Sequence, residues 1–248
     1  MKHLIFIAFL ALILAPSCKK DNTNPIKTLT SIEYQYSDDT STVQYTYDEQ
    51  GRLLTANDGE NQVTYAYANN EITIREWRNS ENREVFYFKG TLDANGHLSG
   101  GTATSKYSAN TTYEQTHEYE YDANGYLVKA RIQRANNQSY AYRYYYTGGN
   151  LTKYEFYTND VLSSYYTYEY TSGNPEHSSL PNVSTFVPEN TFMGKTSAQK
   201  PVKYTRIRSG SADESTINTY TTDEDGYVVK QTSVPSNGTA YTVFYHFE

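Results

Sequence analysis

The sequence predicts an all-β protein, an antiparallel meander of hairpins that curls into a barrel or half-barrel. Three observations predict this fold: aromatic residues alternate with polar ones, one turn motif recurs between the alternating runs, and the chain beyond the first 26 residues shows no amphipathic helix pattern. Tyrosine contributes 28 of the 248 residues, against 9 Phe and 1 Trp, and tyrosine favours strands with a half-buried face. From the usual strand length we expect roughly 12 to 16 strands.

The first 17 residues have the features of a signal peptide. A charged start at Lys2 precedes an apolar run from Leu4 to Leu14, which is too short for a transmembrane helix of about 20 residues but fits a signal-peptide core. Residues 14–18, Leu-Ala-Pro-Ser-Cys, resemble the lipobox of bacterial lipoproteins, in which the cysteine is acylated. Pro16 departs from that pattern, so cleavage by a plain signal peptidase is the alternative. We therefore predict residues 1–17 as signal peptide, Cys18 as the lipid attachment site and residues 18–26 as a polar, lipidated tether.

Residues 27–248 are expected to form a single tyrosine-rich β domain. Alternating runs such as residues 140–146 and 166–170 place aromatic rings on one face of a strand and Thr, Glu or Arg on the other. Strands of this kind belong to antiparallel sheets with one wet face. Residues 173–201 contain four of the seven prolines and no alternation, so we expect an irregular segment that covers an open end or one face of the sheet. Four closing strands are expected after it.

The alternating runs end in a recurring turn, Asp-x-x-Gly-x-apolar. The Asp side chain can accept hydrogen bonds from backbone N–H groups two residues on, and the Gly supplies the positive φ that closes the loop. Degenerate copies follow Tyr67, Tyr146 and Tyr170, so one repeat is about two strands long. The predicted structural turn residues are four Asp–Gly pairs: Asp48 and Gly51, Asp93 and Gly96, Asp122 and Gly125, and Asp223 and Gly226.

The turn and the strand before it resemble known repeats. The unit Tyr-x-Tyr-Asp-x-x-Gly-x-Leu, as in residues 119–127, is similar to the YD repeats of RHS-type proteins, which form coiling β-sheets. Most of residues 27–248 more closely resembles a family of Bacteroidetes lipoproteins classed as a domain of unknown function with a porin-like fold; residues 192–197, 200–202 and 220–230 carry this resemblance. It implies a large, strongly curved meander sheet in a lipidated envelope protein, and it transfers no catalytic or binding residues to this chain.

The sheet is expected to be soluble rather than membrane-spanning. Lipid-facing strands carry aliphatic residues over ~9 to 11 positions, with aromatic residues only at the interfaces. The strands here carry tyrosine through the middle and Glu, Arg, Gln or Thr on the opposite face. Lys19 follows Cys18 directly, whereas an Asp at that position would resemble an inner-membrane retention signal. We therefore expect a lipoprotein of the outer membrane, on its periplasmic or surface face.

The sequence gives little support to catalysis, metal binding or nucleic-acid binding. A balance of 21 basic to 28 acidic residues, net −7, without a basic cluster argues against nucleic acid. The five histidines are scattered without zinc-ligand spacing, and residues 223–226 have a calcium-like composition but lack the later ligands of a calcium loop. Nucleophile-elbow and phosphate-loop motifs are absent. We expect no enzyme, no cofactor and no metal; a hydrolase with paired carboxylates is the least favoured alternative.

The tyrosine face is the one feature that indicates a function, and two interpretations of it remain open. Exposed rings would stack on sugars or other flat ligands, whereas inward rings would fill the barrel as its core. We expect a non-catalytic cell-envelope lipoprotein that binds a glycan, a peptide or a protein partner. The alternative is a structural or assembly component of an outer-membrane complex. The expected partners are the membrane, through the lipid anchor, and a glycan or protein.

Overall fold

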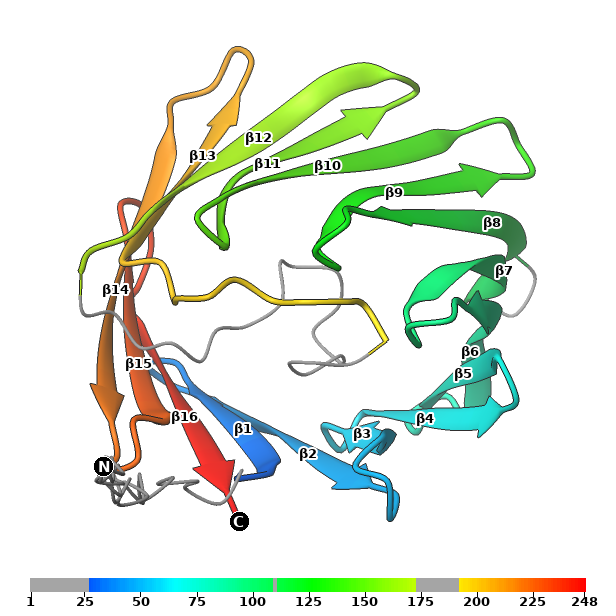
Figure 1. Ribbon diagram of the computed structural model, residues 1–248, viewed down its shortest axis with the longest axis horizontal. Coiled ribbons are helices and arrows are strands. Elements are labelled where there is room, and N and C mark those ends of the chain that lie inside the picture. Colours follow the sequence, from blue (N-terminus) through cyan, green and yellow to red (C-terminus); the bar gives the residue numbers. More distant parts are fainter. Residues whose placement is uncertain (1–26, 109–110, 173–191) are drawn as a thin grey trace, which may run out of the picture.

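The computed structural model describes residues 27–108, 111–172 and 192–248, and every regular element within them is a β-strand (Figure 1). The expected signal peptide, the tether with Cys18, and residues 173–191 of the expected irregular segment lie outside the described residues. In the ranges that the structure describes, no helix is long and apolar enough to cross a membrane.

The strands form one closed antiparallel barrel of sixteen members, in which each strand pairs with its neighbours in sequence and β1 pairs with β16. This confirms the predicted all-β meander and decides for a barrel over a half-barrel. The strands are β1 Leu29–Gln35, β2 Thr40–Tyr47, β3 Leu53–Asn57, β4 Asn61–Ala68, β5 Glu71–Arg78, β6 Arg83–Leu92, β7 Leu98–Ser108, β8 Thr111–Tyr121, β9 Leu127–Arg134, β10 Ser139–Thr147, β11 Asn150–Thr158, β12 Val161–Glu169, β13 Lys203–Arg208, β14 Glu214–Thr222, β15 Val228–Pro235 and β16 Tyr241–Phe247.

The connections alternate between the two ends of the barrel, because successive strands run in opposite directions. One end, here called the Asp-turn end, holds the turns after β2, β4, β6, β8, β10 and β14. The opposite end, here called the far end, holds the turns after the odd-numbered strands. The chain enters and leaves the barrel at the Asp-turn end, where Thr28 and Glu248 exchange two backbone hydrogen bonds of 2.8 and 3.0 Å.

The Asp-x-x-Gly hairpins share an irregularity that bends the sheet. One strand residue beside each turn is left without a partner, at register shifts between Thr46 and Tyr47, Thr91 and Leu92, Glu120 and Tyr121, and Thr221 and Thr222. A bulge increases local twist and bends its strand. Because the bulges recur at the same end of the strands, the bends that they introduce add up, and this favours closure of a long meander into a barrel.

The apolar residue that ends each motif supplies the core at the Asp-turn end. These side chains are almost completely buried, at 1–2% exposure: Leu53, Leu98, Leu127 and Val228. Each of these residues follows its turn directly and points into the barrel, and Leu53, Leu98 and Leu127 belong to the same buried cluster. Part of the buried core thus lies where the sequence repeats its turn.

Residues 192–202, here called the crossing segment, run across the inside of the barrel at the Asp-turn end (Figure 1). Phe192 and Met193 join the buried core, and the Phe192 ring lies 6.0 Å from that of Tyr65. Backbone hydrogen bonds fix the segment to successive turns: Leu98 N–H to Phe192 O at 2.7 Å, Lys195 N–H to Gly125 O at 2.8 Å, and Ala198 N–H to Gly149 O at 2.9 Å.

Candidate functional site

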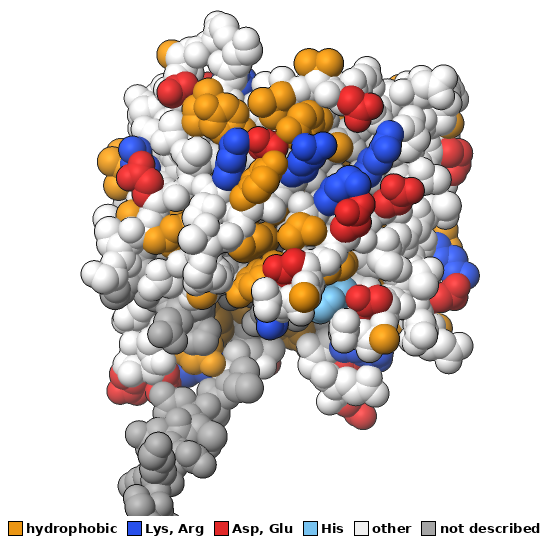
Figure 2. All heavy atoms as spheres, turned by 45° about the horizontal axis from the view of Figure 1, so that its top comes forward, with side chains coloured by type: hydrophobic (Ala, Val, Ile, Leu, Met, Phe, Trp, Pro, Cys, Tyr) orange, Lys and Arg blue, Asp and Glu red, His pale blue; other side chains and the backbone are white. Residues whose placement is uncertain are grey.

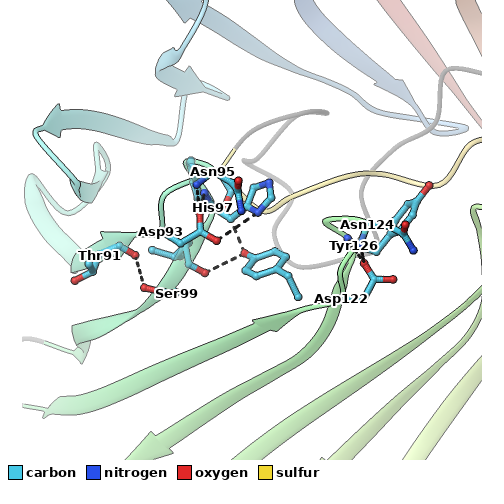
Figure 3. Close-up of polar contacts among 11 residues, drawn as sticks. Thr91, Asp93, Asn95, His97, Ser99, Asp122, Asn124 and Tyr126 are labelled. Atoms are coloured by element: carbon cyan, nitrogen blue, oxygen red, sulfur yellow. Dashed lines mark hydrogen bonds and ion pairs between the residues drawn. The ribbon is translucent and has the colours of Figure 1, made fainter.

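The predicted turn residues all lie at the Asp-turn end, and their side chains bond to backbone rather than pointing at a common point. Asp122 Oδ1 accepts from the backbone N–H groups of Asn124 and Tyr126, both at 2.9 Å (Figure 3). Gly125 has a φ of +86°, a conformation that glycine adopts without strain. Asp48, Asp93 and Asp223 make the same pair of bonds two and four residues on. These contacts close hairpins and leave no shared ligand position.

The acidic turn at residues 223–226 is occupied by a lysine of the same chain. Lys27 Nζ lies 2.6 Å from Asp223 Oδ2 and 2.7 Å from Asp225 Oδ2. These contacts join the start of the barrel to the β14–β15 turn. Among the described residues, no group of three or more His, Cys, Asp or Glu side chains is placed to hold a metal ion.

Most tyrosines face the inside of the barrel, because strand alternation puts them on the same side as the buried core. Tyr45, Tyr65 and Tyr144 are buried to 3–5% exposure. Other inner rings are only partly buried. The buried rings fit the core interpretation, and the partly buried rings leave both interpretations open.

Six partly exposed inner rings on β10–β13 form a continuous stack, here called the aromatic wall: Tyr140, Tyr142, Tyr154, Phe156, Tyr166 and Tyr204. The Tyr142 and Tyr154 planes differ by 8° with centroids 6.0 Å apart, and Tyr142 also stacks on Phe156 at 5.2 Å. Centroids of neighbouring rings across the wall lie 5.2 to 6.4 Å apart, from Phe156 to Tyr204. Such cross-strand aromatic pairs stabilise the sheet and also hold the rings in fixed positions.

Three hydroxyl groups of the wall, those of Tyr142, Tyr154 and Tyr204, hold their protons more tightly than a free tyrosine does. Burial raises the pKa of Tyr142, Tyr154 and Tyr204 above that of a free tyrosine, because a phenolate loses solvation in the barrel. The wall therefore combines apolar ring faces with hydroxyls that both donate and accept hydrogen bonds.

Two arginines flank the aromatic wall and were not identified from the sequence. Arg134, on β9, holds its guanidinium carbon 5.0 Å from the Tyr140 ring centroid, and Arg206, on β13, lies 5.7 Å from that of Tyr166. The Nε atoms of both arginines and the Tyr144 hydroxyl are buried and have no hydrogen-bond partner among the described residues. The position of Arg134 in its strand could have indicated this, because Arg134 is an even number of residues from the inward-facing Ala130 and so lies on the same face of β9.

The outer face of the same strands carries a group whose polar atoms pair with one another. Glu155 is only 7% exposed and accepts hydrogen bonds from Tyr145 Oη at 2.7 Å, Tyr157 Oη at 2.8 Å and Lys153 Nζ at 2.6 Å. Burial alone would raise the pKa of Glu155, but these three hydrogen bonds outweigh it and lower the pKa to about 2. The group pins β10 to β11, and its polar atoms are satisfied within the protein.

The described barrel resembles two solved structures over nearly the whole of each chain. A porin-like protein from Bacteroides uniformis ATCC 8492 matches with a TM-score of 0.65 and 20% identity, covering 90% of this chain and 98% of that one. A porin-like protein from Bacteroides vulgatus ATCC 8482 matches with a TM-score of 0.66 and 12% identity, covering 90% and 99%. No family model matches the sequence, and no curated protein matches it. At these identities the similarity shows a shared fold, the porin-like β-barrel.

Proposed function

We propose that this chain is a non-catalytic cell-envelope lipoprotein whose soluble barrel binds a glycan along the aromatic wall. The observation that carries the proposal is the continuous stack of partly exposed rings inside the barrel. Sugar rings have apolar faces that pack flat on aromatic side chains, and their hydroxyls pair with polar groups placed around them. The tyrosine hydroxyls on the wall can both donate hydrogen bonds to those hydroxyls and accept from them.

A soluble barrel is supported by the charge on its outer face. Figure 2, with the top of Figure 1 turned forward, shows Lys and Arg side chains beside Asp and Glu side chains over that face. Ion pairs occur at several places on the outer surface of the barrel, between Arg75 and Glu84, Lys129 and Glu120, and Lys203 and Glu169. A lipid-facing barrel needs an apolar band ~25 Å tall, and each Arg or Lys at its midplane costs about 2–4 kcal/mol.

The envelope location rests on Cys18 and the sequence before it. Acylation of this cysteine would anchor the barrel without a spanning segment, and the outer membrane is the favoured location. Intact mass spectrometry of the protein purified from membranes should find acyl chains on Cys18. The Cys18→Ser variant should be recovered without detergent. A mature protein of unmodified mass would remove the lipoprotein part of the proposal.

Glycan binding is tested with an oligosaccharide array followed by titration calorimetry. Tyr142→Ala should weaken binding about three- to tenfold, the range expected for one aromatic contact of ~0.5–1.5 kcal/mol. Tyr87→Ala is the matched control, because Tyr87 lies on the outer face of β6 beside Arg75. Equal losses in the two variants, or no glycan bound at all, would refute the proposed site.

The second candidate is an assembly component of an outer-membrane complex, and one outer patch favours it. Ile217 on β14 and Val234 on β15 are direct cross-strand partners and are 54% and 50% exposed. A photo-crosslinking residue at position 217 would capture a stable partner in intact cells. Capture of one envelope protein, together with a negative glycan array, would favour this function over glycan binding.

A further inference from the structure

We infer that the glycan is acidic, and that Arg134 and Arg206 bind its carboxylate or sulfate groups at the two sides of the aromatic wall. This inference rests on the proposed glycan binding and names the class of glycan. The observation behind it is that Arg134 and Arg206 point into the barrel with too few carboxylate side chains nearby to pair with them.

Arg134 is held in place from two sides. It ends β9 near the far end of the barrel, and its guanidinium carbon lies 5.2 Å from the Tyr113 ring centroid on β8 and 5.0 Å from that of Tyr140 on β10. Its Nη1 donates to Gln138 Oε1 at 3.0 Å. Cation–π contacts on both flanks fix the guanidinium, so it is already oriented before a ligand arrives.

Arg134 lacks an anionic partner within the described part of the chain. No described carboxylate lies within ion-pair distance of it, its one side-chain hydrogen bond goes to a neutral amide, and its Nε is buried without an acceptor. Buried donors in folded proteins are almost always paired, and an inward charge without a counter-ion is costly. A planar guanidinium matches the paired oxygens of a carboxylate or sulfate. An acid group on the ligand would therefore complete the site.

Arg206 repeats the shortage on the other side of the wall. Its Nη1 is 3.9 Å from Glu214 Oε2, a long contact, while Arg208 takes the other oxygen of Glu214 at closer range. The Arg206 Nε atom is buried and has no hydrogen-bond partner in the part of the chain that the structure describes. Glu214 thus serves two arginines, and the inner side of β9–β14 near the far end keeps excess positive charge. That charge favours an anionic ligand.

The spacing of the two arginines indicates an extended ligand. They are on β9 and β13, separated by four strand-to-strand steps of ~4.8 Å, which is roughly 19 Å along the wall. The ring contacts form a continuous path between them, which runs through Tyr140, Phe156, Tyr142, Tyr154 and Tyr166 in that order. A ligand with sugar rings on this path and acid groups near both sides fits the arrangement, which describes an acidic oligosaccharide rather than a single small anion.

Calorimetry on the mature lipoprotein in detergent tests the inference with paired probes that differ in charge. One pair is a galacturonate oligosaccharide and its methyl ester, and the other is a keratan sulfate oligosaccharide and its desulfated form. At least one charged probe should bind about tenfold or more tightly than its neutral partner, as expected for a charge-assisted bidentate contact. The pair that shows the difference identifies the acid group.

Variants assign the effect to residues. Arg134→Gln and Arg206→Gln should each weaken the charged probe about tenfold and leave the neutral one unchanged. Arg131→Gln is the matched control, because Arg131 is on the same strand with outward parity and should change neither. Arg134→Lys should restore part of the affinity, since it keeps the charge but loses the planar fork. Circular dichroism melts verify that each variant is folded.

The outcomes separate the inference from the proposed function. Equal affinity for charged and neutral members would overturn the inference and leave glycan binding standing. Discrimination between charged and neutral probes that survives both Arg134→Gln and Arg206→Gln would overturn the assignment to these residues. Binding of no glycan, charged or neutral, would overturn the proposed function and the inference together.

Discussion

Single carboxylates in this barrel act as acceptors for several donors at once. Asp122 accepts from two backbone N–H groups of its own turn, and Glu155 accepts from three side chains on the outer face. In both places the acid is fixed by the groups around it. Each residue gives a test that separates hydrogen bonding from charge.

Asp122→Ala should lower the free energy of unfolding by about 1–2 kcal/mol, because two amides lose their acceptor and the Tyr126 amide is partly buried. Asp122→Asn keeps an oxygen in the same place and should cost less than half as much. Urea denaturation of both variants measures the difference. Equal costs for Ala and Asn would mean that the negative charge, rather than the hydrogen bonds, stabilises the turn.

Glu155 should contribute stability that depends on pH. Its pKa is about 2 in the folded protein and ~4.3 in an unfolded chain, so the stabilisation is fully present above about pH 4.3 and is lost as the pH falls toward 2. Glu155→Gln should therefore cost about 2–3 kcal/mol at pH 7, because each tenfold difference in proton affinity between the two states corresponds to ~1.4 kcal/mol. The difference between wild type and variant should shrink steadily below pH 4.

Glu169→Gln is the control for that measurement. Glu169 pairs with Lys203 at 2.7 Å, but both side chains are exposed, and such surface pairs contribute about 0–1 kcal/mol. Urea melts at pH 7 and pH 3 should show little change for Glu169→Gln at either pH. A loss for Glu155→Gln that stays constant between the two pH values would contradict the linkage to its charge.

Among the elements, the crossing segment connects turns that are distant in sequence. Phe192→Ala should reduce the free energy of unfolding by about 3–5 kcal/mol, the range for a buried Phe replaced by Ala, because the ring packs on Tyr65 within the core. Met193→Leu conserves volume at the neighbouring buried position and should cost less than about 1.5 kcal/mol. Denaturation melts of the two variants compare them directly. A Phe192→Ala cost below that of Met193→Leu would show that the segment rests on the core without supporting it.

Strands and turns were predictable because their signals are local. Alternation marked the runs that became strands, and Asp-x-x-Gly marked hairpins such as those at Asp122 and Asp223. Closure was not local. It depends on β1 pairing with β16, more than 200 residues away, and each edge strand alternates as well as any other. The sequence therefore left a barrel and a half-barrel equally open.

Predicting the candidate site required knowing which face of each strand points into the barrel. Tyrosines occur on both faces of some strands, so they did not identify the inner face. Tyr144 and Tyr146 point inward, while Tyr145, between them, is 41% exposed on the outer face. Arg134 and Arg206 could be assigned to the inside only after the core fixed the parity of β9 and β13. A charged residue in step with buried apolar residues was the signal that sequence reasoning passed over.

At the scale of the whole molecule, the barrel differs from one end to the other. The apolar residues that end the four turn motifs, the crossing segment and both described termini lie at the Asp-turn end. The inner arginines, by contrast, lie toward the far end, where β9 and β13 finish. This polarity relates the candidate site to the proposed anchor.

The anchor and the site should lie at opposite ends of the barrel relative to the membrane. Lys27, held by Asp223 and Asp225 at the Asp-turn end, is nine residues from Cys18, a stretch that spans at most ~32 Å when extended. If Cys18 is acylated as proposed, the Asp-turn end faces the bilayer and the arginine-bearing end faces away from it. A glycan would then reach the wall from the side remote from the lipid.

Fluorophores on introduced cysteines measure this orientation in vesicles that carry a lipid-bound quencher. Gln50→Cys labels an exposed turn at the Asp-turn end, and Ala212→Cys labels an exposed turn at the far end. Quenching should be strong at position 50 and weak at position 212, because the strands of the barrel wall separate the two turns. The same labels on a Cys18→Ser background should show neither membrane association nor quenching. Stronger quenching at position 212 would place the arginines against the bilayer and reverse the proposed route of the ligand.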